Sequence, residues 1–455
     1  MKFPLTIDLS SANLPTGPAT LAYAYIIGGY SPTTDPNTQV NCRLDASGGV
    51  HQLSTQDNTI AANTFPDPNN IVSPTDTAAI NETYPAAWAN YSIPLSVTGP
   101  TFIELGNLNA ANLPGLGTGG SAFSGRIYIS LGVPLLPFTV IGMTSPTEYS
   151  GPSRSPGAVG SLCLYDFLEF SIDSTGAFNL DTSYVDGFGL PLNFIVQPGG
   201  ALQGELNISS KQVLEAISAF DPSVYAGLTQ TTTISTAYPF PAGSGTNYLR
   251  AISPDKLASL VVAKASQTPT PGPKFMTYFD SVISSWDGQS ITVTDSTYGT
   301  YVASGSGLSS VTSGGVVTGT WTFNYVSGNN SGNPAPQTLT YTDVTTANIW
   351  QCAGTLTETA QGKAQAAIGN VILTAFNRGL LSIANPTSIT LSDVNCPSPS
   401  TYYDNTPSNF WSESFHKWSS NGLCYGFAYD DDCAQSSDVD VAAPTGVTIS
   451  LGTMF

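Results

Sequence analysis

Histidine is nearly absent from this sequence, and charged residues of either sign are scarce. Only 9% of the 455 residues are charged, and the two histidines are His51 and His416. So few histidines argue against a histidine-rich metal site, and we expect neither a metal nor another cofactor. Lys and Arg number 12 against 31 Asp and Glu, which gives a net charge of −19. Nucleic acids and anionic membranes bind basic surfaces, so we expect neither as a partner.

Cysteine is also scarce, and no two cysteines form a C-x-x-C pair. The six are Cys42, Cys163, Cys352, Cys396, Cys424 and Cys433. Zinc ribbons and thioredoxin-type sites use such pairs, so the sequence disfavours both. Six scattered cysteines in a large chain fit up to three disulfides in an oxidising compartment. Cys424 and Cys433 flank a short segment and are the best local pair, although spacing does not fix the connectivity.

Long hydrophobic runs are missing as well. No stretch approaches the ~20 apolar residues that a membrane-spanning helix needs. The run Met1–Leu5 is too short for a signal peptide, and we interpret Met1 as a start placed on a mature, secreted, extracellular domain. Hydrophobic residues still make up 41% of the chain, enough for a large core. The surface should be polar but mostly uncharged, which suits a neutral polysaccharide, and we expect a monomer.

The first part of the chain, to about residue 198, is typical of β structure with turns rich in Gly, Pro and Asn. Its clearest predicted strand is 164–172, where Leu168 and Phe170 point one way and Glu169 the other. Further strands are predicted at 21–27 and 124–131.

Helical periodicity appears only after about residue 199. Helices are predicted at 210–220, 254–266, 274–286 and 360–381, and strands rich in Thr, Val and Tyr between 288 and 358. The fold class is therefore mainly β, with a β-domain interrupted by an insert and a wide cleft between the two. We assign residues 1–198 and 390–455 to the β-domain and residues 199–389 to an inserted mixed α/β domain.

Two carboxylates in the segment 168–192 are the first candidate catalytic pair. The segment is typical of a strand, a Gly-containing turn and a second strand, on which Thr182, Tyr184 and Asp186 would share a face. If the two strands pair, Glu169 and Asp186 can project from the same side of the sheet. A polysaccharide hydrolase needs two such carboxylates, one protonated and one ionised. The alternative is that both are solvated charges, Asp186 being a turn residue before a glycine.

A second candidate segment runs from Phe415 to Cys433 and contains three adjacent aspartates, Asp430 to Asp432. These acids could bind a cation, bond sugar hydroxyls or form a charged loop, and neighbouring residues cannot all face one cleft. The aromatic residues at period two over 425–429 predict a strand whose side chains belong to a core.

Several motifs resemble those of known proteins. Glu169-Phe-Ser followed by Tyr184-Val-Asp-Gly-Phe-Gly-Leu-Pro resembles a strand and turn of thaumatin-like proteins, and Tyr425-Gly-Phe-Ala-Tyr-Asp-Asp resembles their closing strand. Further motifs resemble glycoside hydrolase family 64 more than plant thaumatins. They are Ser124-Gly-Arg-Ile-Tyr, Trp350-Gln-Cys-Ala-Gly, Phe376-Asn-Arg-Gly and Phe415-His.

The resemblance implies a thaumatin-like β-sandwich or barrel and an inverting endo-β-1,3-glucanase, some relatives of which release laminaripentaose from β-1,3-glucan. By the family match Glu169 is the general acid and Asp186 the general base. The implied sugar-binding residues are Ser171, Asp173, Phe178, Asp181, Thr182, Ser183, Asp430 and Asp431. The chain departs from plant thaumatins in its few cysteines and in lacking an arginine between Gly160 and Leu168.

Two other classes stay open at this point. Many thaumatin-like proteins bind β-1,3-glucan and cleave it poorly, so a non-catalytic glucan-binding protein is the main alternative. The Ser/Thr-rich strands around 295–345 also fit a structural or adhesive surface protein.

Overall fold

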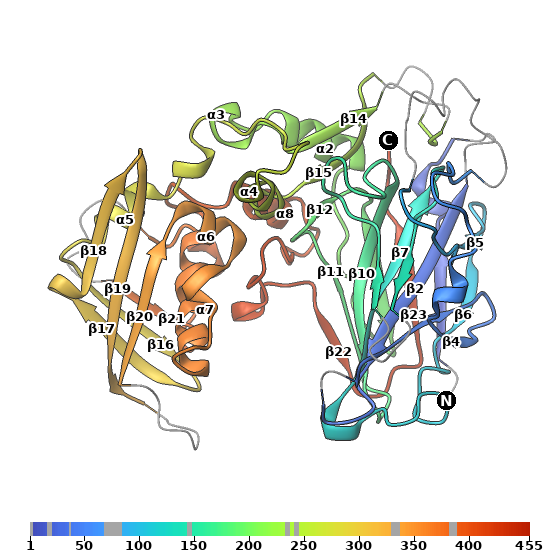
Figure 1. Cartoon of the computed structure of the whole chain (residues 1–455), viewed down its shortest axis with the longest axis horizontal. Coiled ribbons are helices and arrows are strands. Elements are labelled where there is room, and N and C mark those ends of the chain that lie inside the picture. The colour runs from blue at the N-terminus through green and yellow to red at the C-terminus, as the bar shows by residue number, and fades with distance from the viewer. Residues whose placement is uncertain are drawn as a thin grey trace.

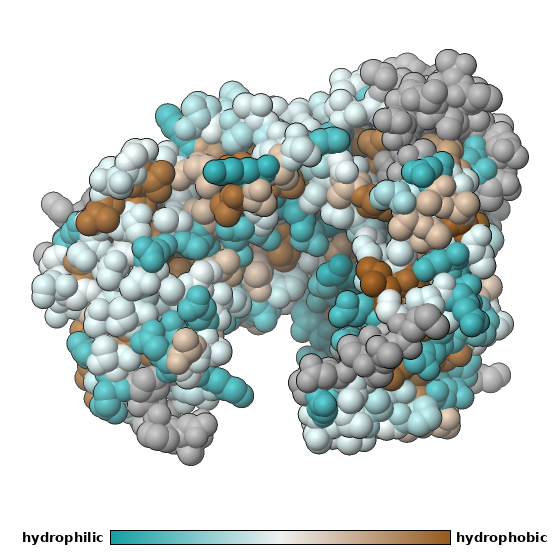
Figure 2. Space-filling view, viewed as in Figure 1, coloured by the Kyte–Doolittle hydropathy of each residue, from teal (hydrophilic) through white to brown (hydrophobic). Residues whose placement is uncertain are grey.

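The computed structural model describes residues 3–15, 21–35, 38–67, 84–142, 148–232, 237–240, 245–328, 337–381 and 389–455. Within these residues the protein is mainly β, and its strands form five sheets. Two lobes stand side by side, joined along one edge by helices and a small sheet (Figure 1). Figure 2 shows a wide groove that separates the lobes on the opposite edge.

The first lobe is a sandwich of two sheets. Its eight-stranded sheet runs β22 (Val439–Val441), β11 (Phe178–Thr182), β10 (Leu164–Ile172), β7 (Phe123–Leu131), β2 (Ala22–Tyr30), β3 (Val40–Leu44) and β4 (Val50–Gln52), with β5 (Ile93–Leu95) also paired to β2. Its four-stranded sheet runs β13 (Leu192–Gln197), β23 (Gly446–Leu451), β1 (Pro4–Asp8) and β6 (Thr101–Glu104). Two short strands, β8 (Thr139–Ile141) and β9 (Glu148–Ser150), pair separately.

The sandwich core forms between the two sheets, because alternate residues of each strand face inward. Ile7 and Ile449 from the small sheet share one apolar cluster with Leu168 and Phe170 from the large sheet. The other face of the large sheet is covered only in part, by a cluster that contains Tyr128 and its neighbours. The rest of that face is left open.

The second lobe is a six-stranded sheet with helices on one face. The strands are β18 (Leu308–Ser313), β19 (Val316–Ser327), β17 (Gly299–Ser304), β16 (Ser290–Asp295) and β21 (Ile389–Ser392), with β20 (Thr338–Val344) paired to β19. The helices are α5 (Asp280–Ser285), α6 (Thr346–Gln351) and α7 (Lys363–Asn377). Trp321 of β19 stacks between Trp286 and Phe376 of α7, with ring centroids 4.4 and 6.1 Å away. Large aromatic rings thus join the helices to the sheet.

A third group of elements connects the lobes. It consists of β12 (Gly187–Phe188), β15 (Asn247–Ile252), β14 (Thr229–Thr232) and the helices α2 (Ser210–Ser218), α3 (Pro222–Tyr225), α4 (Pro254–Ala263) and α8 (Phe410–Trp418). Phe415 of α8 stacks on Tyr184 with ring centroids 4.3 Å apart. Tyr184 and the core of the second lobe belong to one continuous apolar cluster, so the lobes are held by a shared core.

Several predicted elements are confirmed, with shorter bounds. The helices predicted at 210–220, 254–266 and 360–381 are α2, α4 and α7. The helix predicted at 274–286 is split into a 3₁₀ turn at Phe275–Thr277 and α5. Among the described residues, no helix is both long and apolar enough to cross a membrane. The proposed boundaries of the insert at 199 and 389 stay a prediction.

Two predictions about the C-terminal region are wrong. Residues 425–429 form no strand, because the backbone curls around Asp430 and the Gly426 N–H donates to its Oδ2 at 2.9 Å. The chain returns to the sandwich through β22 and β23 instead. Cys433 pairs with Cys396, not with Cys424, across a Cα–Cα distance of 5.9 Å. Within the described residues the other four cysteines are buried and free.

Candidate active site

The candidate site begins with Glu169 in the middle of β10. Its neighbours across the sheet are Arg126 on β7 and Asp181 on β11, both in direct register. Residues directly opposite each other on paired strands share a face, so all three side chains project from the open face of the sheet. The Glu169 side chain is 37% exposed. A base, an acid and a second acid thus form one row.

Arg126 is fixed above the ring of a buried phenylalanine. Its guanidinium carbon lies 4.3 Å from the centre of the Phe167 ring. Its Nε and Nη2 lie 2.9 and 2.8 Å from Oε1 of Glu169. A guanidinium in this place favours the ionised form of Glu169.

Asp181 has the opposite electrostatic setting. Burial, together with the negative charges of Glu169 and Asp438, raises the pKa of Asp181 to about 8. Its Oδ1 is shielded from solvent and has no hydrogen-bond partner within the described structure. A carboxyl with such a pKa keeps its proton at neutral pH. The row therefore combines an ion-paired carboxylate with a proton-bearing carboxyl on the adjacent strand.

Asp186 lies beyond the end of β11, in the turn that leads to β12. Gly187 makes this turn possible: its φ is +147°, and a Cβ there would lie 2.4 Å from the Ala251 carbonyl oxygen. The Nζ of Lys256 in the first turn of α4 lies 3.2 Å from Oδ1 of Asp186. Burial opposes ionisation, but the charges of Lys256, Arg154 and Arg126 hold the pKa of Asp186 below its usual value. Asp186 is therefore ionised at neutral pH.

Glu169 and Asp186 are brought together around one cation. Arg126 contacts Glu169 directly, and its charge also lowers the pKa of Asp186. The predicted geometry is nevertheless wrong in one respect. Thr182 does not share a strand face with Asp186, because β11 ends at Thr182, which pairs with Leu168 and faces the core. The residue directly opposite Glu169 is Asp181.

The same face of the sheet carries a polar row next to Glu169. Ser171 on β10 pairs with Ser124 on β7 and with Asn179 on β11. A surface cavity of about 490 Å³ covers this area. It is lined by Gly28, Gly29, Gln39, Asn41, Ser124, Gly125, Arg126, Tyr149, Glu169, Phe170, Ser171 and Asn179. Hydroxyl and amide groups around a carboxylate can bond the hydroxyls of a sugar chain.

Several predicted sugar-binding residues do not reach this surface. Phe178, Thr182 and Asp430 are 1%, 2% and 0% exposed, and Ser183 is also buried. Phe178 packs on Phe3 inside the sandwich, with ring centroids 4.8 Å apart. For Phe178, Thr182 and Asp430 the prediction of sugar contact is wrong, because strand alternation turns the first two inward and an ion network encloses the third.

Asp173 is in the hairpin turn between β10 and β11. Its Oδ1 accepts hydrogen bonds from the backbone N–H groups of Thr175 and Ala177, at 2.8 and 2.9 Å. This pattern is an Asx turn, which sets the hairpin and thereby the register that places Asp181 opposite Glu169.

The three adjacent aspartates have three different surroundings. Asp430 is buried between Arg378 and His416, whose Nη2 and Nε2 lie 3.2 and 3.1 Å from its two oxygens. Asp431 is exposed, and its negative charge helps to raise the pKa of Asp181. Asp432 accepts a hydrogen bond from Thr374 of α7 at 2.9 Å. Of the three, Asp431 is therefore the one that acts on the Glu169 row.

The ligand atoms of His416, Cys424 and Asp430 lie within 4.8 Å of one another. Oδ2 of Asp430 already accepts hydrogen bonds from Ser412, the Gly426 N–H and His416. Burial raises the pKa of the Cys424 thiol well above its usual value. A satisfied carboxylate and a protonated thiol are poor metal ligands, so we interpret this group as a structural network.

Sequence reasoning missed Arg126, Asn179 and the polar residues of β3 that line the cavity. Arg126 stands in a motif that was noted for its resemblance, but its role depends on the pairing of β7 with β10. The only local signal was the alternation of the strand predicted at 124–131, which puts Arg126 on the same face as Ser124 and Tyr128.

Comparison with known proteins agrees over nearly the whole chain. The model of glycoside hydrolase family 64, described as β-1,3-glucanase, matches residues 7–451. No curated protein sequence matches the chain.

Three solved structures have a similar fold. One is a laminaripentaose-producing β-1,3-glucanase in complex with laminaritetraose, with 21% identity, 99% of both chains covered and a TM-score of 0.63. Another is a family 64 β-1,3-glucanase domain from Clostridium beijerinckii, with 18% identity, 99% and 98% of the two chains covered and a TM-score of 0.60. The third, from Paenibacillus barengoltzii, is a laminaripentaose-producing β-1,3-glucanase complexed with laminarihexaose. It has 17% identity and a TM-score of 0.55, and the match covers 99% of this chain and 75% of that one.

Proposed function

Because the chain belongs to glycoside hydrolase family 64, the β-1,3-glucanases, we propose that it is an inverting endo-β-1,3-glucanase. Its substrate is linear β-1,3-glucan, and its products are short oligosaccharides such as laminaripentaose. The observation that carries the proposal is the arrangement of carboxyl groups with opposite protonation around Arg126. Asp186 is held ionised by Lys256, while Asp181 opposite Glu169 keeps a proton.

In this proposal Glu169 and Asp181 act as one coupled pair. Two carboxyl groups on directly opposed residues share a site in which the second negative charge is disfavoured. The pair therefore holds one proton up to the pH at which Asp181 titrates. Asp181 is the positioning residue that stores this proton beside Glu169, and Glu169 passes it to the glycosidic oxygen.

Asp186 is the general base. It takes a proton from a water molecule whose oxygen attacks the anomeric carbon, while the bond from that carbon to the glycosidic oxygen breaks. The leaving chain receives the proton of Glu169 and ends in a free hydroxyl, and the new reducing end has inverted configuration. Asp186 then releases its proton to solvent, and the Glu169–Asp181 pair takes one up, so the cycle consumes one water molecule.

The geometry around Glu169 also supports a substrate with many neutral hydroxyls. Ser171, Asn179 and Ser124 line the cavity beside it and carry no charge. The aligned polar row continues the direction of the sheet edge into the groove of Figure 2. We also propose that the sandwich lobe is thaumatin-like, on the strength of the Glu169 strand and the turn at Asp186.

We propose that the enzyme works outside the cell. The Cys396–Cys433 disulfide supports this, because disulfides persist in oxidising compartments. Transfer of the protein to a reducing buffer would then lower its thermal stability, which differential scanning fluorimetry can measure.

One observation favours the alternative of a non-catalytic glucan-binding protein. The ion pair with Arg126 stabilises the carboxylate of Glu169, whereas a general acid must be protonated. Product analysis on laminarin and curdlan separates the two functions. Release of short oligosaccharides whose reducing ends appear first as the α-anomer in proton NMR is the expected result. Glucan binding without any release of reducing ends would establish the alternative, and a β-anomer as first product would refute inversion.

A further inference from the structure

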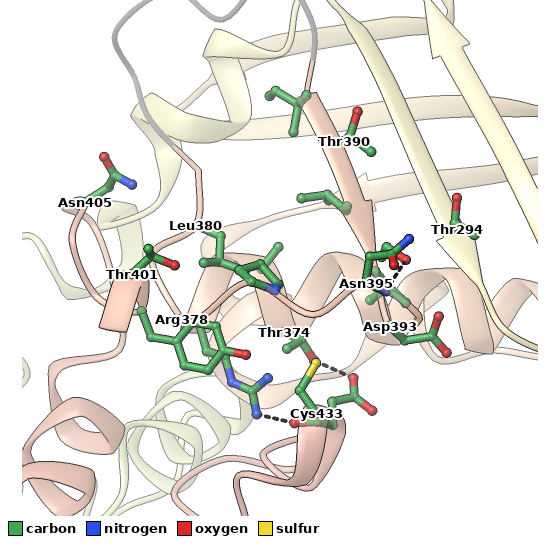
Figure 3. Close-up of a pocket in the computed structure, with 18 of the residues that line it drawn as sticks. Thr294, Thr374, Arg378, Leu380, Thr390, Asp393, Asn395, Thr401, Asn405 and Cys433 are labelled. Carbon is green, nitrogen blue, oxygen red and sulfur yellow. Dashed lines mark hydrogen bonds between the residues drawn. The ribbon is translucent and has the colours of Figure 1, made fainter. Parts of the chain in front are cut away.

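A second cavity, of about 510 Å³, lies in the other lobe. Its walls come from α7, β21 and the chain that follows β21, and the disulfide at Cys433 closes one side (Figure 3). None of its lining residues lines the cavity beside Glu169. Its volume falls within the range of about 300–1,000 Å³ that is usual for small-molecule sites.

Three buried polar atoms at this cavity lack a hydrogen-bond partner within the described structure. They are the hydroxyl of Tyr402, Oδ1 of Asp393 and Nε of Arg378. Tyr402 is 8% and Arg378 1% exposed, and the Arg378 guanidinium lies 4.9 Å from the centre of the Tyr402 ring. The remaining atoms of these groups are engaged. Oδ2 of Asp393 accepts from Ser296 at 2.9 Å, and Nη2 of Arg378 donates to the Asp432 carbonyl at 2.7 Å.

The three atoms define the chemistry of the missing partner. Nε of Arg378 only donates, a carboxylate oxygen only accepts, and the Tyr402 hydroxyl does both. Buried polar groups in folded proteins are almost always paired. A ligand that pairs with all three must itself donate and accept at several points, as the hydroxyl groups of a polyol do.

The rest of the lining selects among polar ligands. Thr390, Thr401 and Asn405 offer uncharged hydroxyl and amide groups (Figure 3), while Val371 and Leu391 form apolar wall. Asp393, Asp404 and Asp432 also line the cavity and disfavour an anion. A pyranose ring matches this surface, because its edge carries hydroxyls and its faces carry apolar C–H groups.

We propose that this cavity binds a neutral glucosyl unit of a β-1,3-glucan chain, as a sugar site separate from the carboxylates at Glu169. The choice of β-1,3-glucan over other neutral sugars rests on the proposed function, whereas the choice of a neutral sugar rests on the cavity alone. Asp431 connects the two sites in the chain: it acts on Asp181, and the next residue, Asp432, lines the second cavity.

The test uses the full chain with Glu169→Gln, so that ligand is bound and not cleaved. Laminaritriose is titrated by calorimetry and soaked into crystals, with cellotriose and glucose as parallel ligands. We expect density for laminaritriose in the cavity and two binding events in solution. Adding Tyr402→Phe, which removes only the unpaired hydroxyl, should weaken one event about tenfold and leave the other.

Two further variants separate blocking from misfolding. Thr401→Trp places an indole at an exposed position of the cavity wall and should abolish the same event. Val394→Trp is the matched control, since Val394 is 55% exposed, adjacent to Asp393 and not part of the wall. It should leave both events unchanged.

The outcomes distinguish this inference from the function proposed above. Laminaritriose bound only beside Glu169, with water alone in the second cavity, overturns the inference and leaves the hydrolase intact. Density for laminaritriose in the cavity of a protein that hydrolyses no glucan supports the sugar site and refutes the hydrolase. Equal binding of glucose or cellotriose supports a neutral-sugar site and overturns its assignment to β-1,3-glucan.

Discussion

Asp181→Asn is the most informative change, because it removes one carboxyl of the coupled pair and keeps the shape of the side chain. Two opposed residues have Cβ atoms about 4.5–5.5 Å apart. At a distance of about 5 Å and an effective dielectric constant of about 20, two like charges repel by about 3 kcal/mol. Glu169 is 37% exposed, so solvent screening reduces this to roughly 1.4 kcal/mol, or about one pH unit.

The sign of the effect follows from the charges. In the native pair the last proton leaves only when two carboxylates come to face each other, which raises the pH of that step; the pKa of Asp181 is about 8. With Asn at 181 that repulsion is absent, and Glu169 beside Arg126 loses its proton at lower pH. The alkaline limb of the kcat profile should therefore move to lower pH by about one unit. Turnover well below the limb should change little.

Initial rates on a soluble laminari-oligosaccharide over pH 4 to 9 give the measurement, with pH values chosen as roughly those over which a perturbed carboxyl titrates. Asp440→Asn is the control, because Asp440 bonds Asn179 on the same strand pair and is not among the charges that act on Asp181. A purely structural role would lower kcat equally at every pH. An unmoved alkaline limb in a well-folded Asp181→Asn protein would refute the shared proton.

Three other changes test the rest of the argument. Glu169→Gln and Asp186→Asn should each lower kcat at least ~10²-fold with an unchanged circular dichroism spectrum, and near-normal turnover would remove that residue from the mechanism. Lys256→Met should raise the pKa of Asp186, since it removes the cation 3.2 Å away, and so move the acidic limb of the kcat profile to higher pH; an unmoved limb would contradict the role of base. Arg378→Met should lower the free energy of unfolding in urea by about 3–5 kcal/mol, because it leaves Asp430 buried without one of its cations, and a loss below about 1 kcal/mol would show that the network is not stabilising.

The sequence predicted elements wherever the local pattern and the final packing agree. β10 alternates between core and open face as its apolar positions require. α2 begins at the expected cap, where Ser209 accepts from the Gln212 N–H and Gln212 bonds back to Ser209. These features depend on residues within one turn or one strand.

The failures share a different cause. The 425–429 segment has the period of a strand, but the buried charge of Asp430 draws the backbone into a curl. The pairing of Glu169 with Asp181 in place of Asp186 depends on the length of the Asp173 turn. Arg126 reaches Glu169 only because β7 and β10 are adjacent. Each depends on long-range pairing or on a buried ion, neither of which a local pattern encodes.

The place of β23 in the sandwich sets the order in which the protein can be assembled during synthesis. β23 lies between β13 and β1, and Leu5 pairs in parallel with Val447. At ribosomal rates of about 5–20 residues per second, β1 waits on the order of 20–90 s for that partner. Over this interval the four-stranded sheet lacks an inner strand, and the apolar face of the large sheet has no complete cover. A nascent chain halted before Gly446 should therefore bind chaperones and be cut readily by proteases, whereas the second lobe, whose strands end at Ser392, can already be closed.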